Sequence, residues 1–261
     1  MKLASPENYR LFGVDFSSNA GEKELIRLIQ ISPERMPLLF CRGDAGTGKT
    51  FAALAGALNE IRSHGAKRAR YKTIFYVREP VEVGHRLGYL KGNEADKYEP
   101  YLGPLLDNYQ RLMSFASKSG EADSYKPTRP KKSDPDAGEI PSAYSKLPSD
   151  IVPLAPEFLR GRSFEDAIIL ADEAQNFTLD ELQMLVTRIG KNCKLIVLGS
   201  PNQVDVPEER GAENPFLLAY QILKPTGMVG YVELTEPMRS SFVAEFDEAF
   251  VAYKKAKKEG K

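Results

Sequence analysis

The chain has 261 residues with 36 basic and 36 acidic side chains, so no net charge draws it toward a polyanion or a membrane surface. Two cysteines exclude a disulfide framework, and no apolar run approaches the roughly 18 residues that a membrane-spanning helix needs. We therefore expect a single α/β domain over residues 1–261, in the reducing cytoplasm and without membrane contact.

The first clear periodicity is a helical stripe of Leu and Ile over residues 22–30, which Pro33 ends. An apolar strand over residues 38–42 follows, and it breaks into a glycine-rich segment. This segment fits the pattern G-x-x-x-x-G-K-[ST], in which backbone N–H groups surround the phosphates of a nucleotide. Its members, which we expect to bind ATP, are Gly43, Asp44, Ala45, Gly46, Thr47, Gly48, Lys49 and Thr50.

Two residues of this segment have distinct expected roles. The ammonium of Lys49 should reach the β and γ phosphates and assist catalysis, and the hydroxyl of Thr50 should ligate Mg²⁺. The alternative, a glycine-rich turn without a ligand, is disfavoured because an apolar strand precedes the segment and an apolar helix follows it. The helix over residues 22–30 either stacks the adenine base or only covers the core.

A second strand is predicted over residues 73–77 and ends at Arg78. Residues at the carboxyl ends of parallel strands face the ligand crevice, so Arg78 is a candidate phosphate-binding residue. An ion pair with Glu79 or Glu82 is the alternative.

A helix is predicted to begin at Pro104, because proline is tolerated at the first helical position and apolar side chains recur on one face. Over residues 114–150 the composition changes to Pro, Lys, Ser, Asp and Gly. Such a mixture buries too little apolar surface to offset its ordering entropy, so we expect a flexible or loosely packed excursion at 114–150.

The apolar strand over residues 167–171 ends in Asp172 and Glu173. In a nucleotide-hydrolysing site, Asp172 would hold the Mg²⁺ shell and Glu173 would polarise the attacking water. The alternative is a pair of exposed helix-capping carboxylates. The next helix has a capping box from Thr178 to Glu181.

Two further strands are predicted over residues 194–198 and 231–234. Gln203 follows the first and is a candidate γ-phosphate sensor, with a turn-stabilising amide as the alternative. Arg239 follows the second and would reach a phosphate of its own subunit or of a neighbouring one.

Together these motifs resemble the PhoH-like family of phosphate-starvation-inducible ATPases. The segments that carry the resemblance are 43–50, 78–84, 87–90, 160–164, 172–176, 187–190 and 203–207. The resemblance implies a P-loop NTPase with a RecA-like, mostly parallel sheet and helices on both faces, related to superfamily 1 helicases. It also implies a homo-hexameric ring that uses ATP and Mg²⁺ to act on RNA or single-stranded nucleic acid, with Arg239 supplied in trans.

The chain departs from the family pattern in three places. Gly199-Ser200 stands where the family usually has Gly-Asp, the excursion at 114–150 is longer than usual, and residues 19–24 lack the glutamine that reads adenine. The leading hypothesis is a motor-type ATPase. The alternatives are a conformational switch that binds ATP with weak or no hydrolysis, and a small-molecule kinase.

Overall fold

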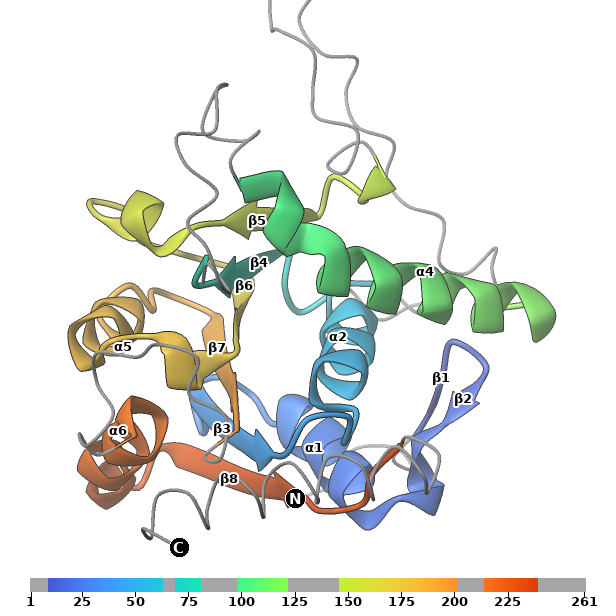
Figure 1. Ribbon diagram of the computed structural model, residues 1–261, viewed down its shortest axis with the longest axis horizontal. Coiled ribbons are helices and arrows are strands. Elements are labelled where there is room, and N and C mark those ends of the chain that lie inside the picture. The colour runs from blue at the N-terminus through green and yellow to red at the C-terminus, as the bar shows by residue number, and fades with distance from the viewer. Residues whose placement is uncertain (1–8, 63–68, 81–97, 122–145, 201–213, 239–261) are drawn as a thin grey trace, which may run out of the picture.

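A six-stranded parallel sheet forms the core of the computed structural model, which describes residues 9–62, 69–80, 98–121, 146–200 and 214–238 (Figure 1). The strand order is β5-β4-β6-β7-β3-β8, and every neighbouring pair is parallel. The strands are β3 (Leu38–Gly43), β4 (Thr73–Arg78), β5 (Ile151–Leu154), β6 (Ala167–Asp172), β7 (Cys193–Gly199) and β8 (Val229–Leu234). This sheet confirms the predicted fold class.

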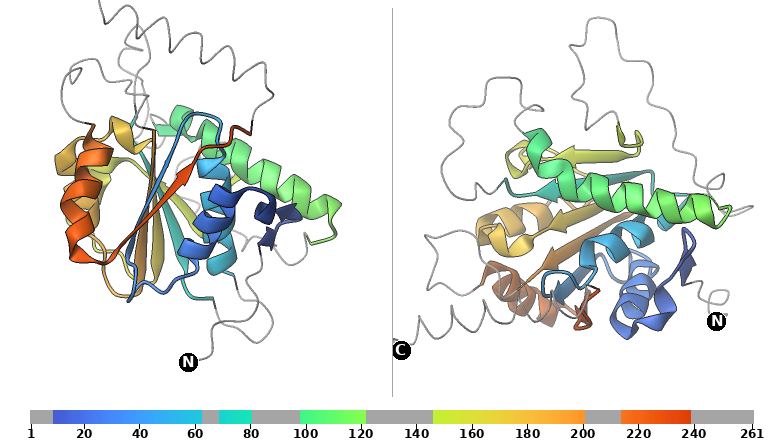
Figure 2. Two further views of the ribbon diagram at one scale, coloured as in Figure 1. Left: turned by 90° about the horizontal axis from the view of Figure 1, so that it is seen from below. Right: turned by 45° about the vertical axis from the view of Figure 1, so that its right-hand side comes forward.

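Successive strand residues point to opposite sides of the sheet, and apolar side chains lie on both sides. Helices therefore cover both faces. On one face lie α1 (Ala20–Ile29), α2 (Lys49–Glu60) and α4 (Gly103–Lys118), and on the other α5 (Leu179–Val186) and α6 (Pro215–Leu223) (Figure 2, left). In β3, Leu39 and Cys41 face the first group, whereas Leu38 and Phe40 face the second. Strands β6 and β7 are buried along their whole length, which explains their continuous apolar sequences.

Two predicted helix ends have local explanations in the structure. The capping box of α5 is confirmed: Glu181 N donates to Thr178 Oγ1 at 3.2 Å, and Thr178 N donates to Glu181 Oε2 at 2.8 Å. At the other end of the sheet, Lys194 closes the carboxyl end of α1. This lysine is fully buried, and its ammonium donates to the backbone oxygens of Leu28, Ile29 and Ile31 at 2.9, 3.0 and 2.6 Å.

Several elements were not predicted. A short antiparallel pair, β1 (Arg10–Leu11) and β2 (Val14–Asp15), precedes α1. Strand β5 and helix α6 also lacked a sequence prediction. Short 3₁₀ helices complete the described residues: η1 (Phe16–Ser18), η2 (Glu99–Leu102), η5 (Pro156–Leu159), η6 (Ala174–Asn176) and η8 (Lys224–Thr226).

The predicted excursion at 114–150 begins too early. Helix α4 continues to Lys118, and Ala116 is fully buried against the core, because the apolar spacing of the helix extends past residue 114. At the other end Leu147 is also buried. Residues 122–145 lie outside the described residues.

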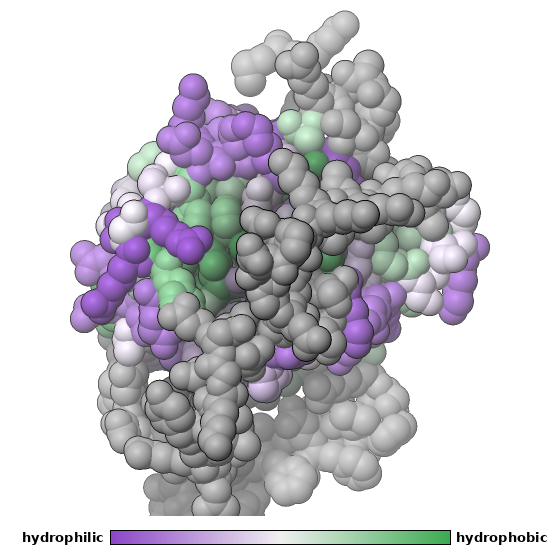
Figure 3. Space-filling model, turned by 90° about the horizontal axis from the view of Figure 1, so that it is seen from above, coloured by the Kyte–Doolittle hydropathy of each residue, from purple (hydrophilic) through white to green (hydrophobic). Residues whose placement is uncertain are grey.

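Strand β5 forms one edge of the sheet. Seen from above, the side on which β5 lies in Figure 1, the surface has an apolar area bordered by hydrophilic side chains (Figure 3).

Of the helices in the described ranges, none has the length and apolarity to cross a bilayer.

Candidate nucleotide-binding site

The glycine-rich segment forms a tight loop between the carboxyl end of β3 and the start of α2. Gly46 and Gly48 have φ angles of 80° and 83°, a region that residues with a Cβ rarely adopt. A Cβ on Gly43 would lie 2.6 Å from Thr47 Oγ1 and 2.8 Å from the backbone oxygen of Leu234. The path of the loop therefore depends on all three glycines of the motif.

Lys49 turns back over this loop. It is 7% exposed, and Nζ donates to the backbone oxygens of Gly43 at 2.7 Å and Asp44 at 3.0 Å. Lysine has three N–H donors, so these bonds hold the ammonium in place and leave donor capacity for an anion. Helix α2 starts at Lys49 and directs its first N–H groups and its positive dipole end to the same place. The loop is thus built to bind phosphate groups.

Asp172 is the last residue of β6, so it lies at the same carboxyl edge of the sheet as the phosphate-binding loop, and it is 1% exposed. Its Oδ1 accepts hydrogen bonds from Thr50 Oγ1 at 2.9 Å and from Glu173 N at 3.1 Å. Its Oδ2 accepts one from Tyr76 Oη at 2.7 Å. The structure therefore brings the phosphate-binding loop and the acidic strand end together, as the sequence motifs required.

The donor set suits Mg²⁺. The Thr50 hydroxyl donates its proton to Asp172, which leaves the lone pairs of the hydroxyl oxygen for a hard cation. Mg²⁺ is commonly bound by one or two protein oxygens together with waters and substrate phosphates. In the described ranges, no cluster of three or more His, Cys, Asp or Glu side chains is placed to hold a metal ion. Thr50 and Asp172 thus fit a cation that binds together with a nucleotide.

Glu173 has a left-handed backbone, with φ 54° and ψ 46°, which is uncommon for a residue with a side chain. Its Oε2 accepts a hydrogen bond from Gln175 Nε2 at 2.7 Å, and Gln175 Oε1 accepts one from Ser200 N at 2.9 Å. Ser200 Oγ in turn donates to Asp44 Oδ1 at 3.3 Å. These bonds connect the acidic pair, the end of β7 and the phosphate-binding loop.

Arg78 lies beside Asp172, its register partner on the neighbouring strand. The guanidinium Nη1 is 3.8 Å from Asp172 Oδ2, and the side chain is 23% exposed. Tyr98 fixes the backbone here, since its Oη accepts from Arg78 N at 3.0 Å and donates to Arg78 O at 2.9 Å. The ion pair of Arg78 is thus with Asp172, and the structure shows none with Glu79; Glu82 lies outside the described residues.

Sequence reasoning missed Glu22, which packs against the loop from α1. It is 3% exposed, and a Cβ on Gly48 would lie 2.6 Å from its Oε1. Burial raises the pKa of Glu22 to about 7, and the nearby carboxylate of Glu236 contributes to this rise. Asn19 caps the helix by accepting from Glu22 N at 3.0 Å, so the Asn-x-x-Glu spacing was the signal available in the sequence.

Gln203 and Arg239 lie outside the described residues, so their roles stay predictions. The residue before Arg239 is described: Met238 N donates to the backbone oxygen of Gly46 at 2.8 Å. The chain therefore leaves β8 in direct contact with the phosphate-binding loop.

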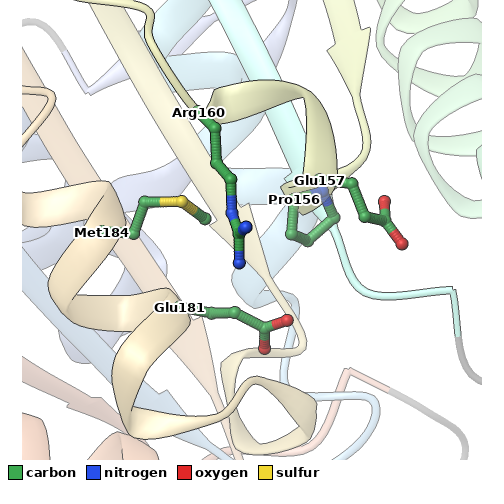
Figure 4. Close-up of a pocket in the computed structure, with 5 residues that line it drawn as sticks. All are labelled: Pro156, Glu157, Arg160, Glu181 and Met184. Carbon is green, nitrogen blue, oxygen red and sulfur yellow. The ribbon is translucent and has the colours of Figure 1, made fainter.

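A separate pocket of about 290 Å³ lies between η5 and α5 (Figure 4). Pro156, Glu157, Arg160, Glu181 and Met184 line it, and Arg160 extends toward Glu181 across the opening. None of the predicted site residues lines this pocket.

Comparison with known proteins identifies a family whose sequences resemble this chain. The model of the family described as PhoH-like protein matches residues 17–251. A PhoH-like protein of Mycobacterium tuberculosis (strain ATCC 25618 / H37Rv) is 34% identical over 218 residues, which are 83% of this chain and 53% of that protein. A PhoH-like protein of Bacillus subtilis (strain 168) is 31% identical over 232 residues, or 88% of this chain and 62% of that protein. The chain thus spans about half to three fifths of the length of these relatives.

Among solved structures, the large terminase of a thermophilic bacteriophage aligns with a TM-score of 0.47 and 10% identity, covering 88% of this chain and 49% of that one. The SWI2/SNF2 ATPase core of Sulfolobus solfataricus, in complex with dsDNA, aligns with a TM-score of 0.42 and 12% identity, covering 89% and 47%.

Proposed function

The chain belongs to the PhoH-like protein family, and on that premise we propose that it is a Mg²⁺-dependent ATPase of the motor type that acts on RNA or single-stranded nucleic acid. The observation that carries the nucleotide part is the 2.9 Å hydrogen bond between Thr50 and Asp172, which lie 122 residues apart in the chain. It joins a phosphate-binding loop to a buried carboxylate, the two halves that nucleotide hydrolysis requires.

In this proposal each residue has a defined task. The loop N–H groups and Lys49 bind the triphosphate, and Thr50 and Asp172 hold Mg²⁺, which when bound neutralises phosphate charge. Glu173 lies next to Asp172, and its carboxylate orients and polarises the attacking water. Gln175 fixes the Glu173 side chain through the 2.7 Å bond described above.

The nucleic-acid partner and the assembly are proposed from the family resemblance. The formal net charge is zero, so binding of a polyanion depends on a local basic surface or on repeated copies around a pore. A homo-hexamer would place Arg239 of one subunit at the nucleotide of the next, with Gln203 sensing the γ phosphate. Arginine fingers of this kind contribute on the order of 10³–10⁵ in turnover, so an isolated subunit should hydrolyse ATP slowly.

The test is steady-state phosphate release with and without single-stranded RNA and DNA. We expect Mg²⁺-dependent hydrolysis that nucleic acid stimulates, and its loss in Lys49→Ala and Asp172→Asn. Lys191→Ala, an exposed lysine outside the site, serves as the matched control. A parent that hydrolyses no ATP with any nucleic acid, and binds nucleotide no better than Lys49→Ala, would contradict the proposal.

The assembly has its own test. Arg239→Ala and Lys49→Ala subunits are each expected to be inactive, but a mixture should regain activity if the arginine acts in trans. A mixture that stays inactive, together with a monomer by light scattering in the presence of an ATP analogue, would refute the ring.

Ser200 favours a second candidate, an ATP-binding switch with weak hydrolysis. It is fully buried and occupies the place of the usual acidic residue, and it contributes only a hydroxyl toward Asp44. Tight nucleotide binding without cleavage in a single-turnover assay would favour the switch over the motor.

A further inference from the structure

The two oxygens of Asp172 have different partners, and one of these partners comes from neighbouring strand β4. We propose that Tyr76 is a positioning residue for the magnesium end of the site: its hydroxyl holds Asp172 Oδ2, so that Oδ1 stays directed at Thr50 and the cation. This inference rests on the proposed function, because it concerns how the same carboxylate is oriented.

The position of Tyr76 suits this task, and its hydroxyl also interacts with the Arg78 side chain. It is fully buried, it lies two residues before Arg78 on β4, and it faces the α2 side of the sheet, as Asp172 does. Its Oη donates to Asp172 Oδ2 at 2.7 Å, a length typical of a hydroxyl bonded to a carboxylate. Because Thr50 and Glu173 N bond to Oδ1, the two carboxylate oxygens are held by different partners.

Arg78 explains why the carboxylate needs this second support. Its Nη1 lies 3.8 Å from Asp172 Oδ2, longer than a direct hydrogen bond. Without the Tyr76 hydroxyl, the carboxylate can turn toward the guanidinium and form a closer charge-assisted pair. That rotation moves Oδ1 away from Thr50, and the site loses its oxygen arrangement for Mg²⁺.

The experiment is a Mg²⁺ titration of nucleotide binding by Tyr76→Phe, which removes one hydroxyl and keeps the ring. Loss of a group that orients a metal ligand typically costs about 10–100-fold in metal affinity, so the Mg²⁺ concentration for half-maximal binding should rise by about that factor. Nucleotide affinity without Mg²⁺ should stay the same. Tyr71→Phe is the matched control, since Tyr71 is equally buried but precedes the opposite end of β4.

The outcomes separate this inference from the proposed function. A parent without Mg²⁺-dependent nucleotide binding overturns both. A parent that responds to Mg²⁺ while Tyr76→Phe and Tyr71→Phe respond identically to it overturns the positioning role alone. An equal loss of nucleotide affinity with and without Mg²⁺ in Tyr76→Phe also overturns it, because that pattern marks a structural defect.

A second measurement does not depend on the folding of Tyr76→Phe. The chain has 12 tyrosines, and ¹³C labelling at tyrosine Cζ reports the hydrogen bond of each hydroxyl. We expect one signal to shift when Mg²⁺ is added to the nucleotide-bound parent, and the same signal to shift in Asp172→Asn. If no tyrosine signal responds to either change, the proposal is wrong.

Discussion

Replacing Glu22 by glutamine should make the protein more stable at alkaline pH than the parent. Glu22 lies in the first turn of α1, is 3% exposed and packs against Gly48. Its burial, with Glu236 nearby, raises the pKa of the carboxyl from 4.5 to about 7, so the folded state disfavours the ionised form. Glutamine keeps the size of the side chain and removes its charge.

The sign and size of the effect follow from proton linkage. Below pH 4.5 the carboxyl is protonated in both the folded and the unfolded state, and its ionisation costs nothing. Between pH 4.5 and about 7 the unfolded state ionises first, so the free energy of unfolding falls as the pH rises. A displacement of this size corresponds to at most about 3 kcal/mol at pH 8. Glu22→Gln removes this loss.

The assay is urea unfolding of the parent and Glu22→Gln at pH 5 and pH 8. The variant should gain at most about 2.5 kcal/mol relative to the parent over this interval, because part of the loss is already present at pH 5. Glu24→Gln is the matched control on the same helix: Arg27 donates to both Glu24 carboxylate oxygens at 2.7 Å and lowers the pKa of Glu24, so its loss should bring no gain at pH 8. Equal pH dependence in Glu22→Gln and the parent would refute the reasoning.

Three further predictions concern other parts of the molecule. Lys194→Met should lower the free energy of unfolding by about 2–4 kcal/mol, because three backbone oxygens at and just after the end of α1 lose their donor. Chemical denaturation measures this loss. A loss no larger than that of the exposed Lys191→Met would contradict the prediction. Gln175→Leu should reduce kcat for phosphate release by about 10-fold, since it frees the Glu173 side chain. Because Gln175 also accepts from Ser200 N, the variant loses that link toward the loop as well, and Ser200→Ala, which keeps this backbone bond, is the control. An unchanged kcat in Gln175→Leu would show that Gln175 does not position Glu173. Single-stranded RNA binding should weaken steeply between low and physiological salt in a filter-binding titration, and a salt-independent affinity would argue against phosphate contacts.

The meeting of the loop and the acid could be predicted from sequence, whereas the residues that support them could not. The motif that contains Lys49 fixes a loop at the end of one strand, Asp172 ends another, and parallel strands present their carboxyl ends at one edge. Tyr76 carried no such signal, and Gln175 belongs to the motif segment 172–176 but had no expected role of its own. Tyr76 is one more aromatic residue in an apolar strand, and its partner is decided by the pairing of β4 with β6.

Strand β5 and helix α6 also lack a clear sequence pattern. Strand β5 has four residues and includes Pro153, which removes a donor from the ladder and weakens the sequence pattern of a strand. Its place at the edge of the sheet tolerates that loss. Helix α6 has an identifiable start, since Asn214 caps it and Pro215 occupies its first turn. Its high overall hydrophobicity obscures the one-sided spacing by which an amphipathic helix is recognised.

The hydrogen bond from Met238 to Gly46 has a mechanical consequence. It connects the peptide plane of the phosphate-binding loop to the chain that continues beyond β8, without any side chain between them. A rotation of that peptide would stretch or break the bond, so the positions of Gly46 and Met238 are coupled. The phosphate-binding loop and the exit from β8 therefore hold each other in place through a single backbone hydrogen bond.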